Sequence, residues 1–154
     1  MNLQLESRQA ESLSVGRPSV DRPTVNGPTG WRICAIRGAT TVPENSVEAM
    51  AAAVNELLDA VESRNPLEPA NIVSVTFSAT KDLDAVFPAA IARPRPGWDA
   101  VPLLDVQQMH VVGCLPRCIR LMIHIYLPTH HTPINHAYLR GAGKLRPDLC
   151  TAAE

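Results

Sequence analysis

The feature that most constrains the fold is the stretch CIRLMIHIYL at residues 118–127, where large apolar residues occupy every second position. A period of two residues is typical of a β-strand that presents one side to a protein core. The residues between them are mostly polar or amphipathic, and they would face the other side of the strand. The first side is formed by Ile119, Leu121, Ile123, Ile125 and Leu127, and the second by Arg120, Met122, His124 and Tyr126.

Four shorter strands are also expected. Residues 31–36 are apolar and are followed by Gly38, so we expect a strand that runs into a glycine turn. Residues 72–78 alternate apolar residues with Ser and Thr, which is a second strand pattern. Residues 101–104 form a brief apolar strand, and Tyr138-Leu139 form a closing strand.

One long helix is expected between the first two strands. Asn45 is the predicted N-cap and Glu48, three residues later, its reciprocal capping partner. The helix should end near Arg64, because Asn-Pro follows. A short helix over 85–92 and a helical turn over 133–137 complete an α+β pattern without strict alternation. Apolar residues follow the helical period in the long helix at Val47, Met50, Val54, Leu57, Leu58 and Val61.

The composition fits one domain of 154 residues with a core of Val, Ile, Leu and Ala, since only six residues are aromatic. The formal net charge is -1 without a basic block, which argues against nucleic acids and membrane surfaces as partners. The N-terminus lacks the charged start and apolar core of a signal peptide. We therefore expect a cytoplasmic protein with its four cysteines as thiols.

The first thirty residues differ from the rest, because they hold Pro18, Pro23 and Pro28 and little apolar periodicity. They are expected to be a disordered extension, with a short arm packed on a neighbouring subunit as the alternative. The domain is then expected over 31–149, with a flexible tail over 150–154.

A search for standard catalytic motifs finds no phosphate loop, nucleophile elbow or zinc-spaced His-Glu pair. Cys114 and Cys118 form one pair of possible ligands, and a metal site would need more. The histidines gather loosely near a loop, and solvent exposure is the favoured interpretation over a metal role. We expect neither a metal nor a cofactor. The five histidines are His110, His124, His130, His131 and His136.

Four arginines at strand ends or inside a strand are the candidate functional residues: Arg37, Arg93, Arg120 and Arg146. Arg120 lies within an otherwise apolar strand, where burying a guanidinium without an anion would be costly. One interpretation is an internal salt bridge to Asp or Glu. The other is a dianionic ligand held by the guanidinium groups.

Five successive runs resemble signatures of the AroH-type chorismate mutases. They are IRGATTV at 36–42, SATKDLDAVFPA at 78–89, GWDAVPLL at 97–104, CIRLM around Arg120, and HAYLRGAGKLRPDL at 136–149. The resemblance spans residues 31–149 in the same order and without insertions. It implies a mixed sheet flanked by helices, three copies packed as a pseudo-barrel, and active sites in clefts between neighbouring subunits.

The resemblance also implies a role for each matched residue. Arg37 would bind a substrate carboxylate, Arg120 would reach the ether oxygen and the pyruvyl carboxylate, and Tyr138 would contact the pyruvyl side. Arg93 and Arg146 would lie near the mouth and help to hold the other carboxylate. The matched positions that line the pocket are Phe87, Ala89, Leu104 and Leu145.

The implied reaction is the rearrangement of chorismate to prephenate in aromatic amino-acid biosynthesis. One C–O bond breaks while one C–C bond forms, so no nucleophile, base or metal is required. The site must hold the substrate in a compact conformation and place positive charge beside the ether oxygen. Arg120 is the candidate for the second task.

Three pocket positions depart from the family pattern. The family usually has a glutamate where this chain has Gln108, often a small residue such as cysteine at Asp105, and often a lysine at Ala90. Our hypothesis is that Asp105 supplies the missing carboxylate and accepts the bond from the ring hydroxyl. The alternative is a strand-end aspartate that faces solvent or a backbone amide.

These departures leave two other functions to consider. The first is a catalytically weak homologue that binds chorismate-like dianions in a regulatory role. The second is a trimeric binding or deaminase-type protein that shares only the architecture. The presence of Arg37, Arg93, Arg120 and Tyr138 together argues against both.

Overall fold

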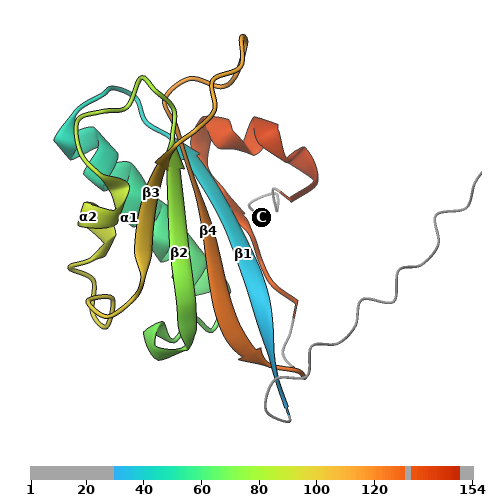
Figure 1. Cartoon of the computed structure of the whole chain (residues 1–154). Coiled ribbons are helices and arrows are strands. Elements are labelled where there is room, and N and C mark those ends of the chain that lie inside the picture. The colour runs from blue at the N-terminus through green and yellow to red at the C-terminus, as the bar shows by residue number, and fades with distance from the viewer. Residues whose placement is uncertain (1–29, 131–132, 150–154) are drawn as a thin grey trace, which may run out of the picture.

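The computed structural model describes residues 30–130 and 133–149, and these form a sheet with helices packed against one face (Figure 1). The sheet order is β3-β2-β4-β1-β5. β4 pairs antiparallel with β1 and β2, whereas β2–β3 and β1–β5 are parallel pairs. The predicted α+β class with a mixed sheet is confirmed. The strands are β1 (Trp31–Thr41), β2 (Ile72–Ala79), β3 (Leu103–Gln107), β4 (Cys118–Pro128) and β5 (Ala137–Tyr138).

The strand predicted from the alternating stretch is β4, the central strand of the sheet. Its five Ile and Leu residues are all buried, from Ile119 to Leu127, as the pattern predicts. They lie on the side covered by α1 (Val47–Arg64), which runs behind the sheet in Figure 1. The opposite face of the sheet has no helix laid across it in this view.

The long helix lies where it was predicted, but its cap is one residue later. Ser46 Oγ accepts a hydrogen bond of 3.2 Å from the Ala49 amide, so Ser46 is the N-cap of α1. Asn45 instead accepts bonds of 3.1 Å from the amides of Asp84 and Ala85 and stabilises the chain before α2. The prediction of Asn45 and Glu48 as a capping pair is therefore wrong, because a tertiary contact uses the Asn45 side chain.

The first strand is longer than predicted, because Gly38 lies inside β1 and does not end it. A Cβ atom at this position would lie 3.1 Å from Leu121 Cγ and 3.2 Å from Leu57 Cδ1. The glycine thus allows α1 and β4 to approach the strand closely. The extra length places Ala39 opposite Arg120 in the antiparallel pairing.

The shorter elements differ from the prediction at their ends. α2 spans Pro88–Ala92 and not 85–92, because Asn45 holds the preceding turn and Pro88 occupies the first helical turn. β3 begins at Leu103 rather than 101, since Val101 closes a turn on the buried Trp98.

The C-terminal part also departs from expectation. Residues 133–136 are not helical, and the Asn135 amide donates 2.9 Å to Asn65 Oδ1 at the end of α1. The predicted helical turn is thus wrong there, and the closing strand shifts by one residue to β5. Three short 3-10 helices were not predicted: η1 (Pro69–Asn71), η2 (Arg140–Leu145) and η3 (Pro147–Leu149).

Several predictions concern the ends of the chain. The expected extension over 1–30 and the tail over 150–154 lie outside the described residues, apart from Gly30. Within the described ranges, no helix has both the length and the apolar character needed to cross a bilayer. Cys34, Cys114 and Cys118 are free thiols.

Candidate active site

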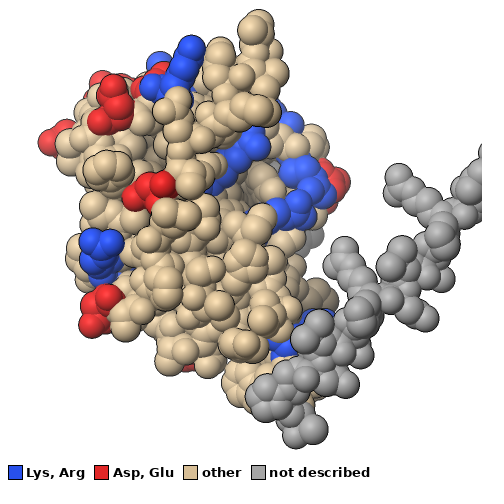
Figure 2. Space-filling view, viewed as in Figure 1, with Lys and Arg blue, Asp and Glu red and all other residues tan. Residues whose placement is uncertain are grey.

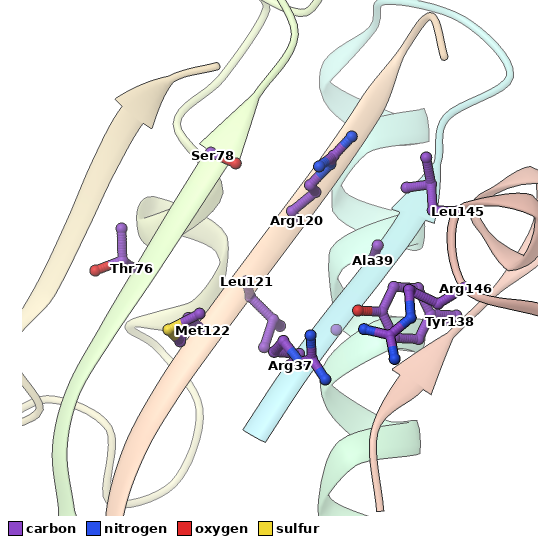
Figure 3. Close-up of a pocket in the computed structure, with 11 residues that line it drawn as sticks. Arg37, Ala39, Thr76, Ser78, Arg120, Leu121, Met122, Tyr138, Leu145 and Arg146 are labelled. Atoms are coloured by element: carbon purple, nitrogen blue, oxygen red, sulfur yellow. The ribbon is translucent and has the colours of Figure 1, made fainter. Parts of the chain in front are cut away.

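The helix-free face of the sheet contains a hollow with a cavity volume of about 410 Å³. Arginine and tyrosine side chains from β1, β4, β5 and the segment after η2 meet there (Figure 3). Lys and Arg side chains also gather around a recess on this face in the space-filling view (Figure 2). We call it the arginine hollow, with Arg37, Arg120, Tyr138, Leu145 and Arg146 as its principal residues.

Arg120 projects from β4 into this hollow, because its neighbours Ile119 and Leu121 point into the core. Its Nε is buried and has no hydrogen-bond partner in the described part of the chain. No carboxylate among residues 30–130 and 133–149 forms an ion pair with it. The internal salt bridge considered from the sequence is therefore absent there. Burial raises the pKa of the adjacent Cys118 thiol, and the Arg120 guanidinium opposes this.

Arg37 lies on β1, and its surroundings include a residue that sequence reasoning missed. Its backbone N–H donates 3.1 Å to His136 Nδ1, and its guanidinium NH2 lies 3.4 Å from His136 Nε2. Burial lowers the pKa of His136, and the positive charges of Arg37 and Arg146 lower it further. His136 is half-buried, so solvent exposure was the wrong prediction for this histidine. The available signal was its place two residues before Tyr138, where the predicted closing strand begins.

The rest of this hollow comes from the C-terminal segment. Tyr138 lies beside Ala39 in the parallel β1–β5 pairing, which brings it to the arginines. Arg146 donates from Nε and NH2 to both Asp148 oxygens, at 2.9 and 2.6 Å. Arg146 therefore already holds a carboxylate at the mouth of the hollow. This pair raises the pKa of the Arg146 guanidinium and lowers that of the Asp148 carboxyl.

Two of the other predicted site residues, Phe87 and Asp105, line a second hollow of about 530 Å³ between β3 and the segment that leads into α2. We call it the Phe87 hollow. Phe87 is 72% exposed and Leu104 58%, which is unusual for large apolar side chains. Arg93 and Ala90 are also exposed nearby, whereas Ala89 is only 4% exposed and packs into the core.

Asp105 lines the Phe87 hollow and not the arginine hollow. Its Oδ1 accepts a bond of 3.0 Å from the Ala89 amide in the first turn of α2. Burial raises the pKa of this carboxyl, and the Ala89 amide and the Arg93 charge oppose the increase. The backbone-amide contact considered from the sequence is therefore present, and it uses one of the two carboxylate oxygens.

Gln108 lies at the end of the sheet that carries Arg120. Its amide donates 2.8 Å to the Ala79 carbonyl, and Ala79 and Ser78 pair with Ile119 and Arg120. Gln108 Oε1 is buried without a hydrogen-bond partner in the described ranges. This end of the sheet thus holds a buried acceptor on Gln108 and a buried donor on Arg120, both unsatisfied.

Seven of the sequence-predicted residues therefore line two separate hollows: the first is lined by Arg37, Arg120, Tyr138, Leu145 and Arg146, and the second by Phe87 and Asp105. The arginine hollow offers guanidinium donors, a phenol and apolar walls, while the described residues contain no cluster of three or more His, Cys, Asp or Glu placed to hold a metal ion. Such a set has the chemistry of a binding site for a small organic anion.

Comparison with known proteins identifies the family. Residues 33–149 match the family described as chorismate mutase type I. The chain is 40% identical over 117 residues to chorismate mutase AroH of Bacillus subtilis (strain 168), covering 76% of this chain and 92% of that protein. It is 41% identical over 118 residues to chorismate mutase AroH of Thermus thermophilus, covering 76% and 96%. This chain belongs to the type I chorismate mutases.

A solved structure agrees with this assignment. The chorismate mutase from Clostridium thermocellum superposes with a TM-score of 0.66 at 42% identity. The match covers 72% of this chain and 98% of that one. The resemblance inferred from the five sequence runs is thus confirmed in both sequence and fold.

Proposed function

We propose that this chain is an isomerase that rearranges chorismate to prephenate, and two relatives named chorismate mutase AroH support this. The observation that carries the proposal is Arg120, which lines a hollow with Arg37 and Tyr138 and whose buried Nε–H has no hydrogen-bond partner among the described residues. A buried donor of this kind is satisfied once an anionic ligand binds. The reaction belongs to aromatic amino-acid biosynthesis.

The chemistry needs only two contributions from the protein. The bond from carbon to the ether oxygen breaks as the new carbon–carbon bond forms, and no proton is transferred. Arg37 holds a carboxylate and, with Tyr138, keeps the pyruvyl side folded over the ring. Arg120 donates to the ether oxygen as negative charge develops on it. Neither contribution requires a cofactor.

We further propose that three copies assemble and that each site is shared between two of them. The separation of the predicted residues into two hollows supports this, because neither hollow alone holds the full set. Large apolar side chains left exposed on the surface also support cover by another subunit: Phe87, Leu104, Val106, Met122 and Tyr126. In this arrangement the Phe87 hollow of one subunit closes the arginine hollow of its neighbour. The proposal includes no nucleic-acid or membrane partner.

The ring hydroxyl of the substrate has two candidate acceptors. Gln108 Oε1 is buried without a partner in the described residues, at the end of the sheet that carries Arg120, so it is suited to accept from this hydroxyl without adding charge. Asp105 keeps one oxygen that makes no bond to the Ala89 amide, and we propose that it reaches the hydroxyl from the neighbouring subunit.

The Asp105 role is tested with two variants. Asp105→Asn retains an acceptor for the Ala89 amide but carries no charge, whereas Asp105→Ala removes both. We expect kcat/KM to fall in both, because each lacks the carboxylate. If Asp105→Asn matched the parent while Asp105→Ala did not, Asp105 would serve only to stabilise α2.

The mutase activity itself is tested by adding the purified protein to chorismate and following the loss of chorismate absorbance. We expect turnover that depends on protein concentration and yields prephenate. Binding of chorismate without turnover would instead indicate a catalytically weak homologue in a regulatory role.

The expected boundaries and location remain part of this proposal. The family match over 33–149 supports a mutase domain over 31–149. The three free thiols of the described residues support a reducing, cytoplasmic location, which cell fractionation would test.

A further inference from the structure

His136 lies directly before β5 and contacts Arg37, a residue that lines the arginine hollow. Three cations approach it from different elements. Arg37 on β1 contacts the ring, and Arg146 after η2 contributes positive charge nearby. Arg64 of α1 donates 3.2 Å to the His136 carbonyl. The acidic group on this side is Asp148, which is already paired with Arg146.

The contacts of the imidazole determine which nitrogen carries its proton. Nδ1 accepts the hydrogen bond from the Arg37 amide, at 3.1 Å. A neutral imidazole has one acceptor and one donor nitrogen, so Nε2 carries the hydrogen. The Nε2–H group and the Arg37 NH2 group, 3.4 Å apart, are then both donors and cannot bond to each other.

Two neighbouring donors without a mutual bond form a natural site for one acceptor. A carboxylate placed beside them would accept hydrogen bonds from Arg37 and from His136, either on separate oxygens or on the same oxygen. We propose that neutral His136 positions Arg37 through Nδ1 and donates from Nε2–H to the carboxylate that Arg37 binds. This inference rests on the proposed function, because it deepens the role of the same site.

The neutral form is favoured by the surroundings of the ring. Burial lowers the pKa of His136, and the charges of Arg37 and Arg146 act in the same direction. The free protein should therefore keep His136 neutral above the ordinary value of about 6.5. Its contribution to stability is complete above that pH, and it decreases as the pH falls below that value toward the lower pKa of the folded state.

Two substitutions separate the two ring nitrogens. His136→Asn can retain an acceptor near Nδ1 for the Arg37 amide but has no group at the Nε2 position. His136→Gln can place an amide N–H near Nε2 but loses the inner acceptor. We expect His136→Asn to raise KM for chorismate roughly tenfold or more, because a bond to a charged group is lost, with kcat little changed.

The expected result for His136→Gln is the opposite combination. Its KM should stay closer to the parent value, while its unfolding midpoint should fall because the Arg37 amide loses its acceptor. His130→Asn is the control, since His130 is exposed and outside both hollows, and it should change neither quantity. An unchanged KM in His136→Asn, with an active parent enzyme, would overturn the inference.

A second measurement does not depend on turnover. Nitrogen-15 spectra of the parent protein at pH 7.5 should show His136 as the neutral tautomer protonated on Nε2, with a titration midpoint below about 6.5. Finding the tautomer protonated on Nδ1 would contradict the proposed contacts. If the parent did not convert chorismate, the proposed function would fail while this tautomer result would stand on its own.

Discussion

The two faces of the one sheet make different contributions to this protein. On the helix side, strand residues such as Phe77, Ile123 and Ile36 are fully buried against α1. On the other side, the same strands present Arg37, Arg120 and small polar residues to a hollow. Successive residues of β4 thus face opposite sides of the sheet, one side toward the core and the other toward the hollow.

This difference shows how stability and chemistry can be separated within a single strand. Burial of apolar area stabilises the fold, whereas a guanidinium that lacks a counter-ion does not. Substitutions on the helix face should therefore change the free energy of unfolding, and substitutions on the open face should change catalysis. Four substitutions test this separation.

The largest effect is expected for Phe77→Ala on the helix face. Phe77 is fully buried, and loss of its ring should lower the free energy of unfolding by about 3–5 kcal/mol, through lost burial and a cavity. Urea unfolding measures this. Val73→Ala, on the exposed start of the same strand, should change it by less than about 0.5 kcal/mol. Equal losses in the two variants would contradict the assignment of the core face.

Arg120→Gln on the open face should have the next largest effect, on catalysis. Removing the donor to the ether oxygen should lower kcat by at least about a hundredfold, the usual loss for such a donor. The unfolding midpoint should remain close to the parent or rise, since an unpaired guanidinium is removed. Arg32→Gln carries the same charge change at an exposed position of β1 and should retain parental rates. Near-normal turnover by Arg120→Gln would exclude the assigned role.

Gly38→Ala tests a position that contacts the core and also lines the arginine hollow. Its new methyl would lie 3.1 Å from Leu121 Cγ and 3.2 Å from Leu57 Cδ1. Overpacking of this kind should cost about 1–3 kcal/mol of unfolding free energy. It should also displace the neighbouring Arg37 and raise KM. A destabilised variant with parental KM would indicate that the faces are independent even here.

The smallest effect is expected for Ser46→Ala, far from the open face. Loss of the cap on α1 should reduce the free energy of unfolding by about 1 kcal/mol and leave kcat and KM unchanged. Thermal unfolding together with steady-state kinetics checks both. Asn45→Ala serves as the comparison, because it leaves the cap of α1 in place: Asn45 contacts the chain before α2 and not the helix amides.

The sequence predicted those features that depend on local periodicity. The alternation of β4 predicted its buried side and the position of Arg120, and the apolar spacing predicted α1. Features that depend on tertiary contacts were not predictable in the same way. Gly38 resembled a turn because its close neighbours, Leu57 and Leu121, are distant in sequence. His136 was missed because its partner Arg37 lies 99 residues earlier.

The site itself was predicted as a list of residues rather than as an arrangement. The resemblance supplied both groups, but periodicity could not show that they lie in two hollows of one chain. Asp105 illustrates this, since its contact with Ala89 depends on where α2 begins, and that boundary was predicted three residues early. The arrangement that we propose to join the two hollows is one complete site formed by two subunits.

The most direct test of that claim is complementation between two inactive variants. Arg120→Gln disables the arginine hollow, and Phe87→Asp places a carboxylate in the other hollow, where it would repel the dianionic substrate. The two variants are unfolded, mixed in equal amounts and refolded together. Each half of a site then comes from an intact hollow with a probability of about one half, so about one quarter of the sites have both halves intact. We predict recovery of about a quarter of the parental activity. A mixture no more active than the two variants refolded separately would contradict a shared site.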